Sequence, residues 1–260
     1  INSDAEVVNK LGSNAMGNYL YVYKGVYATD EDVPVNPLTG ERLRMGGNTS
    51  TQAYFKAGDP IWVDVNGDYI IDEKDKVIVG NSQPRMTGGI SINLRYKAFS
   101  INTNCSFTLR RDIINKALAD RFRAYGTPVA GKVNLTGSGA LTPIEAYNFW
   151  TEDNIYAQYP NPFDYTRSSI IQPFRYDQTL FMEDGSYFKI NGISVAYTIP
   201  KKMLDFFRIS RCQLNFSMNN IYTFSKYSGI NPENVNNLGY DTSGGYPNGR
   251  TVTFGVSMDF

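Results

Sequence analysis

Apolar and polar residues alternate with a period of two along several long stretches of the chain. Near the carboxy terminus, residues 250–260 place apolar side chains at every second position, namely Val252, Phe254, Val256, Met258 and Phe260. This alternation predicts a β-strand with one apolar and one polar face. The stretch is longer than the ~5–6 residues of an average strand in soluble proteins. It matches the ~9–11 residues of a strand that crosses a membrane.

The same pattern recurs upstream and predicts further long strands. They cover residues 88–96, 99–110, 187–198 and 212–222, with a sixth candidate at 18–27 whose facing is ambiguous. A short turn at Lys97 joins the first two as a hairpin. Within residues 187–198 the apolar phase slips by one position at Asn191 and Gly192, which predicts a β-bulge there.

The polar faces of these strands are rich in amides. Buried amides without partners cost ~1–3 kcal/mol each, so a wet surface suits them better than a dry core. One interpretation is a membrane barrel, with apolar faces toward lipid and polar faces toward a water-filled lumen. The other is a one-layer sheet, with the apolar face on a protein core and the polar face in bulk water. On the first interpretation, the candidates for lining the lumen are Asn102, Asn104, Gln213, Asn215 and Asn219.

The lengths of the connecting segments favour the barrel. They are long after residue 27, short at 96–98, long at 111–186, short at 199–211 and longer again at 225–248. Outer-membrane barrels combine short periplasmic turns with long outer loops in this way. Such a barrel needs at least ~8 strands and tolerates no open edge in lipid. We therefore expect an all-β fold in which about six strands form the carboxy-terminal part of a larger transmembrane antiparallel barrel with long extracellular loops.

Composition narrows the function classes. The chain has 25 Lys and Arg residues, 25 Asp and Glu residues and a formal net charge of zero, which argues against a nucleic-acid partner. It has no His, so neither a His-dependent triad nor a zinc hydrolase is expected. The two cysteines, Cys105 and Cys212, are too far apart in sequence for a metal-type pair. No catalytic constellation is recognisable, and we expect a protein that is not an enzyme.

Residues 64–75 carry the sharpest local motif, DVNGDYIIDEKD. Oxygen ligands fall at the spacing of an EF-hand-like calcium loop, with a main-chain carbonyl in the middle of the set. The ligands would be Asp64, Asn66, Asp68, Ile70 (through its carbonyl), Asp72 and Asp75. The motif departs from the pattern because Tyr69 stands where the turn requires Gly, and the last ligand is Asp rather than Glu. A plain Asn-Gly-Asp turn between two short strands is the alternative. Both interpretations stay open, and no cofactor beyond a possible structural calcium ion is expected.

Aromatic residues suggest two further roles. Those in a long connecting segment could stack on sugar rings or pack within the loop, namely Tyr156, Tyr159, Phe163 and Tyr165. Those on the apolar strand faces are expected to face lipid, namely Phe216, Phe254 and Phe260.

Four segments resemble the carboxy-terminal portion of SusC/RagA-type TonB-dependent transporters. They are GDPIWVDVNGDYIIDEKDKVIVGNSQPRMTGGISINLRYKAFSI (58–101), EDGSYFKINGISVAYTIPKKML (183–204), LNFSMNNIYTFSKYSGINPE (214–233) and GRTVTFGVSMDF (249–260). They occur in the family's order and cover nearly half of the chain. Residues 112–182 match only weakly.

The resemblance implies an outer-membrane barrel of 22 strands with an amino-terminal plug, a SusD-like surface lipoprotein as a lid, and energy from TonB. It implies import of large nutrients, most often oligosaccharides and in some members peptides. Residues 1–260 would be the carboxy-terminal part of the barrel, with the signal peptide, plug and remaining strands preceding Ile1. Phe260 would belong to the signal that the outer-membrane assembly machinery recognises. A secreted β-sandwich that binds carbohydrate and is stabilised by calcium is the alternative from a different class.

Overall fold

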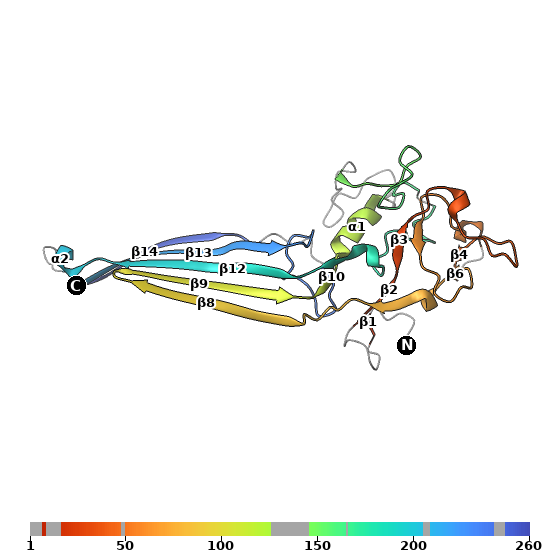
Figure 1. Cartoon of the computed structure of the whole chain (residues 1–260). Coiled ribbons are helices and arrows are strands. Elements are labelled where there is room, and N and C mark those ends of the chain that lie inside the picture. Colours follow the sequence, from red (N-terminus) through yellow and green to blue (C-terminus); the bar gives the residue numbers. More distant parts are fainter. Residues whose placement is uncertain are drawn as a thin grey trace. The chain divides into compact units, whose positions relative to one another are not determined.

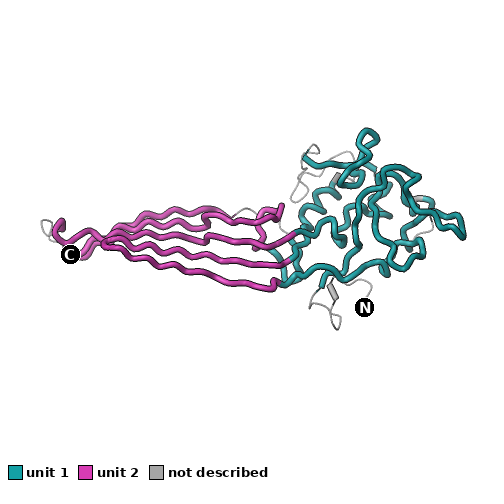
Figure 2. Tube along the Cα trace, viewed as in Figure 1, with its two compact units in different colours: residues 1–83, 112–183, 234–244 teal, residues 84–111, 184–233, 245–260 magenta. Residues whose placement is uncertain are grey.

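The computed structural model describes residues 7–8, 17–47, 50–125, 146–164, 166–204, 209–241 and 248–260. The chain divides into two compact units, each assembled from several separate segments (Figure 2). Unit 1 comprises residues 1–83, 112–183 and 234–244, and unit 2 comprises residues 84–111, 184–233 and 245–260.

Unit 2 is built around one antiparallel sheet of five long strands (Figure 1). The strands are β8 (Met86–Tyr96), β9 (Phe99–Leu109), β12 (Tyr187–Thr198), β13 (Arg211–Ser225) and β14 (Thr251–Asp259), in the spatial order β14-β13-β12-β9-β8. Two residues join β8 to β9, and Lys97 in this turn has a positive φ of 52°. The short helix α2 (Lys201–Leu204) follows β12. These strands confirm the ones expected from alternation between residues 86 and 260.

The predicted β-bulge is also present. The register of β12 shifts between Ile190 and Gly192 against both of its neighbours, β9 and β13. The two apolar phases of β12 consequently lie on the same face of the sheet. A Cβ at Gly192 would lie 2.8 Å from the side-chain oxygen of Asn219, so a larger residue at the bulge would require Asn219 to move.

Unit 1 contains short strands and helices around its own aromatic core. Its strands are β1 (Val7–Val8), β2 (Gly17–Tyr21), β3 (Tyr23–Val26), β4 (Arg44–Met45), β5 (Pro60–Trp62), β6 (Ile70–Ile71), β7 (Lys76–Val79) and β10 (Asp112–Ile114), and β10 pairs with β11 (Met182–Asp184). Its helices are α1 (Lys116–Tyr125) and the 3₁₀ turns η1 (Asp30–Asp32), η2 (Thr51–Ala53), η3 (Glu73–Asp75) and η6 (Thr179–Phe181). None of the helices in the described part of the chain has the length and apolar character needed to cross a membrane.

The core of unit 1 is dominated by aromatic rings. Phe122 on α1 is fully buried and packs edge-on against Phe149 and Tyr159, with ring centroids 4.9 and 5.1 Å away. A second cluster stacks Tyr21 on Trp62 at 5.2 Å. Edge-to-face aromatic pairs each contribute ~0.5–1.5 kcal/mol beyond area burial. The long segments that the sequence suggested to be loops thus contain a folded core.

A buried charge network lies beside the second cluster. Arg175 stacks over Tyr21 at 4.5 Å and donates two hydrogen bonds to Asp177, whose carboxylate also binds Lys76 at 2.8 Å. Burial opposes ionisation of Asp177, but the hydrogen bonds and charge of Arg175 outweigh it and hold the pKa of Asp177 below its usual range. Breaking such a buried pair costs several kcal/mol, so the network fixes how β2, β7 and the 175–178 segment meet.

The prediction of a sixth barrel strand at residues 18–27 is wrong. These residues form β2 and β3, which pair with β7 and β5 in unit 1 and not with the five-stranded sheet. Four of the five residues of β2 are buried, so both faces of this strand are covered by protein. The tyrosine hydroxyls of this strand form hydrogen bonds within unit 1. The Tyr19 hydroxyl, for example, donates to the Glu73 carbonyl at 2.8 Å. The alternating pattern in this segment therefore belongs to a strand that protein covers on both faces.

Candidate functional site

The pairing register of the five-stranded sheet separates apolar from polar residues across all five strands. One cross-strand row consists of apolar side chains throughout, namely Phe254, Phe216, Val195, Ile101 and Leu94. The adjacent row on the other face consists of small polar side chains, namely Thr253, Ser217, Ser194, Asn102 and Asn93. The one-residue offset between the rows places them on opposite faces.

The apolar face is not covered by any part of the chain that the structure describes. Phe254 is 79% exposed, Leu94 is 60% exposed and Val256 is 58% exposed. The rings of Phe254 and Phe216 pack against each other with centroids 5.0 Å apart, so the face is a continuous apolar surface. Contiguous apolar surface of this kind marks contact with lipid or with another protein layer.

The polar face brings all five predicted amides together. Asn102, Asn104, Gln213, Asn215 and Asn219 occupy polar positions of β9 and β13. Cross-strand hydrogen bonds join the side chains on this face: Ser91 donates to Asn104 at 2.9 Å, and Asn102 donates to Ser194 at 3.4 Å. The amides and serines thus form a polar ladder across adjacent strands. Their role in lining a lumen stays a prediction.

One end of the polar face is covered by residues 226–233, here called the cover segment. The Lys189 ammonium, on a residue only 7% exposed, binds the Glu233 carboxylate at 2.5 Å. The Arg111 guanidinium donates to the carbonyl of Pro232, and the side chain of Tyr227 is buried. A hollow of about 250 Å³ remains here, lined in part by Lys189, Asn231, Asn248 and Arg250.

The other end of the polar face, beside the short turns, carries a basic hollow of about 650 Å³. Its charged lining residues are Arg95, Lys97, Lys201 and Arg211, and its polar lining residues include Ser100, Thr198 and Gln213. Arg211 donates a hydrogen bond to Gln213 at 3.1 Å. Among the described residues, no ion pair involves any of these four cations. This site was not predicted from the sequence, because the zero total charge hides the excess of Lys and Arg residues in unit 2. A count of charges segment by segment, in place of the chain total, would have pointed to it.

The predicted calcium loop forms a network of turns. Asp64 accepts hydrogen bonds from the backbone N–H groups of Gly67 at 2.7 Å and Tyr69 at 2.8 Å. Asp75 is buried and accepts from Val65 and Asp72, each at 2.8 Å. Burial raises the pKa of the Asp75 carboxyl in spite of these N–H donors.

The other predicted ligands take part in the same network. Asp68 accepts from Ile70 at 2.9 Å and its N–H donates to Asn66 at 3.0 Å, while Asp72 accepts from Lys74 at 2.8 Å. Within the described residues, no group of three or more carboxylate or cysteine side chains is placed to hold a metal ion. Tyr69 has a positive φ of 61°, so the position that requires Gly in a calcium loop does adopt the left-handed backbone. Binding of calcium here stays a prediction.

The loop aromatics divide between the two predicted roles. Tyr159 packs in the core of unit 1, as expected for packing within the loop, whereas Tyr156 is 84% exposed. Phe163 is partly exposed, and Tyr165 lies outside the described residues. Two of the four aromatics are therefore accessible to a ligand.

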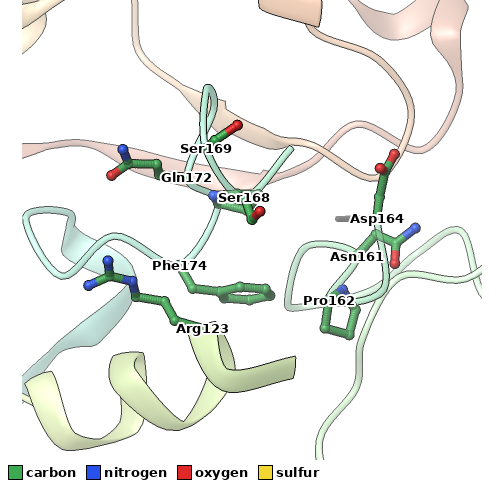
Figure 3. Close-up of a pocket in the computed structure, with 9 residues that line it drawn as sticks. Arg123, Asn161, Pro162, Asp164, Ser168, Ser169, Gln172 and Phe174 are labelled. Atoms are coloured by element: carbon green, nitrogen blue, oxygen red, sulfur yellow. The ribbon is translucent and has the colours of Figure 1, made fainter. Parts of the chain in front are cut away.

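Unit 1 also contains a small hollow of about 200 Å³ with both polar and apolar lining residues (Figure 3). Ser168, Ser169 and Gln172 approach it from one segment, and Arg123 reaches it from α1. Asp164 in its wall is bound to the Lys56 ammonium at 2.5 Å. Burial opposes ionisation of Asp164, but Lys56 and Thr166 outweigh it and lower its pKa. An acid held ionised in this way is a poor proton donor.

Comparison with known proteins places these features in context. No protein-family model matches the chain. It is 28% identical over 257 residues to TonB-dependent receptor P3 of Formosa agariphila, covering 93% of this chain and 22% of that protein. It is 23% identical over 270 residues to TonB-dependent receptor SusC of Bacteroides thetaiotaomicron, covering 96% of this chain and 24% of that protein. The chain thus spans about a quarter of the length of these relatives.

The fold comparison agrees with the sequence comparison. A structure of the RagAB peptide transporter superposes with a TM-score of 0.64 at 18% identity, covering 99% of this chain and 24% of that chain. At this identity the superposition is evidence for the fold alone. Taken together, sequence and fold confirm the predicted resemblance: this chain is similar to the SusC/RagA-type TonB-dependent transporters over a segment of about a quarter of their length.

Proposed function

We propose that this chain is the carboxy-terminal part of the barrel wall of a TonB-dependent outer-membrane transporter that imports large nutrients. One observation carries the proposal: a sheet of long strands has an uncovered apolar face and an amide-rich polar face. A membrane barrel accommodates both faces, with the apolar one in lipid and the polar one in a water-filled interior. The plug, the remaining strands and the signal peptide would then precede residue 1.

Oligosaccharides are the proposed cargo, imported together with a SusD-like surface lipoprotein. The amide ladder supports this choice, because amides supply both donors and acceptors to hydroxyl-rich ligands. The exposed Tyr156 and the partly exposed Phe163 offer aromatic surface to sugar rings. Peptide import is the second candidate, and the specific observation in its favour is the superposition on a transporter named for peptides.

The secreted β-sandwich has less support. A sandwich requires a second layer over the apolar face, and Phe254 and its neighbours on that face are largely exposed. In the proposed orientation these side chains contact acyl chains, and Phe260 contributes to the signal for barrel assembly.

Membrane extraction and uptake by whole cells test the proposal. The full-length protein should require detergent for extraction and should migrate differently on gels before and after heating, as closed barrels do. Cells that lack its gene should lose uptake of labelled oligosaccharides, and deletion of the partner lipoprotein should have the same effect. Extraction without detergent would contradict the proposal, and selective loss of labelled peptide uptake would favour the second candidate.

A structural calcium ion in residues 64–75 is a separate proposal. It is supported by the ligand spacing and by the left-handed backbone of Tyr69. A cation would offset the mutual repulsion of Asp64, Asp68, Asp72 and Asp75. Anomalous density in the intact protein at millimolar calcium tests it, and an empty loop under these conditions would reject it.

A further inference from the structure

We propose that the polar face of the five-stranded sheet selects anionic cargo, and that the basic hollow beside the short turns binds its carboxylate or sulfate groups. The inference rests on the proposed function and specifies the substrate class.

Charge is distributed unevenly along a chain whose total is zero. Unit 2 contains twelve of the 25 Lys and Arg residues and only four of the 25 Asp and Glu residues. The segments that build the sheet are therefore strongly basic. A surface of one sign raises the local concentration of ligands of the opposite sign, most of all within a cleft that has low-dielectric walls.

The basic hollow concentrates this charge at one place. Arg95, Lys97, Lys201 and Arg211 line it together, and they take part in no ion pair among the described residues. Neighbouring like charges repel one another, and binding of an anion converts that repulsion into attraction. Arginine is well suited to the task because its planar guanidinium binds carboxylate and phosphate-like groups through two parallel hydrogen bonds.

The hollow belongs to the polar face. Arg95 lies opposite Ser100 in the register, and Arg211 lies two residues before Gln213 on the same face of β13. This side of the sheet is opposite to the one that carries Phe254 and Leu94. Lipid headgroups are therefore the weaker candidates, whereas a solute that moves along the wet face would meet these cations directly. Rings of Arg and Lys side chains give anion pores their selectivity in the same manner.

The size of the hollow and its uncharged lining residues also fit an oligomeric solute. A volume of about 650 Å³ exceeds the space that a single inorganic ion needs. Its uncharged lining includes the hydroxyls of Ser100 and Thr198 and the amide of Gln213. These groups can form hydrogen bonds with ligand hydroxyls that lie next to an anionic substituent. At the opposite end of this face, Lys189 is neutralised by Glu233, so Arg250 supplies the charge of the smaller hollow.

Binding of matched polyanionic and neutral glycans to the purified full-length transporter tests the inference. Short dextran sulfate and unsulfated dextran of equal length serve as probes, and hexaglutamate distinguishes carboxylate from sulfate. We expect tighter binding of dextran sulfate, weakening as salt shortens the Debye length from ~10 Å at 0.1 M. The double variant Arg95→Gln/Arg211→Gln should weaken binding of dextran sulfate by at least about tenfold, because the charge-assisted contacts of both arginines to the sulfate groups are lost. Binding of dextran should change less than about twofold.

A charge-matched control separates the hollow from general charge. Lys201 lines the hollow and the adjacent Lys202 does not, so Lys201→Gln should weaken binding of dextran sulfate more than Lys202→Gln. Equal affinity for the two dextrans, or an unchanged affinity in the double variant, overturns the inference. A double variant that unfolds at lower temperature with unchanged affinity also overturns it, because the cations would then pair with an acidic protein segment. Failure of the proposed function has a different signature: binding that depends on the arginines persists, while cells without the gene retain uptake.

Discussion

Substitution of Phe254 by arginine distinguishes lipid contact from exposure to water. Phe254 is 79% exposed within the described chain, and its main protein contact is the ring of Phe216, with centroids 5.0 Å apart. Loss of such an aromatic pair costs ~0.5–1.5 kcal/mol, and an exposed substitution in water adds at most ~0.5 kcal/mol. An arginine at the bilayer midplane on the lipid face of a barrel costs ~2–4 kcal/mol. The free energy of unfolding of Phe254→Arg should therefore fall by more than the ring contact can explain.

The matched control lies one position away on the same strand. Thr253 belongs to the polar row, opposite Ser217, so Thr253→Arg should change the free energy of unfolding by less than ~1 kcal/mol. Phe254→Leu removes the ring contact and keeps the side chain apolar, which isolates the contribution of lipid. Urea unfolding of the full-length protein in vesicles, together with its abundance in the outer membrane, measures all three variants. Equal destabilisation by Phe254→Arg and Thr253→Arg would refute the assignment of the two faces.

Three other predictions concern side chains away from the apolar face. Glu233→Gln should lower the free energy of unfolding by ~1.5–3 kcal/mol, because Lys189 loses a charged partner; Lys189→Met in the same chain should restore part of the loss, as urea unfolding can measure. Asp177→Asn should destabilise unit 1 by ~3–5 kcal/mol at pH 7. Because the folded pKa of Asp177 is lowered, this contribution is present above the unfolded value of ~3.9 and is lost as pH falls through the folded pKa, so melting temperatures of wild type and variant should converge in acid. For residues 64–75, millimolar calcium should raise the melting temperature relative to a chelator, and an unchanged value would leave the plain turn as the explanation.

The strands of the sheet could be predicted because each one carries its own signal. Alternation in 250–260 and 99–110 follows from the two-residue repeat of a strand, and the phase slip at Asn191 is the local signature of a bulge. The five amides lie on one face of the sheet for the same reason. Residues two positions apart on a strand share a face, and the pairing register aligns these faces between strands. No contact between distant residues was needed for any of these predictions.

The folded core of unit 1 was not predictable in this way. Phe122, Phe149 and Tyr159 lie in segments without regular alternation, and only tertiary packing brings their rings together. The same limit explains the error at 18–27, where Tyr19 and Tyr21 at alternate positions of β2 imitate a barrel strand although protein covers both faces.

The sequence by itself determined which residues form the long strands, which face of each is apolar, and to which family the chain is similar, because these properties depend on local periodicity and on ordered motifs. Only the tertiary structure placed Arg95 on β8 and Arg211 on β13 around the same hollow and brought Glu233 to Lys189. The physical reason is that the electrostatic character of a surface depends on distances in space. A chain with zero net charge can therefore carry a basic face that its total charge does not reveal.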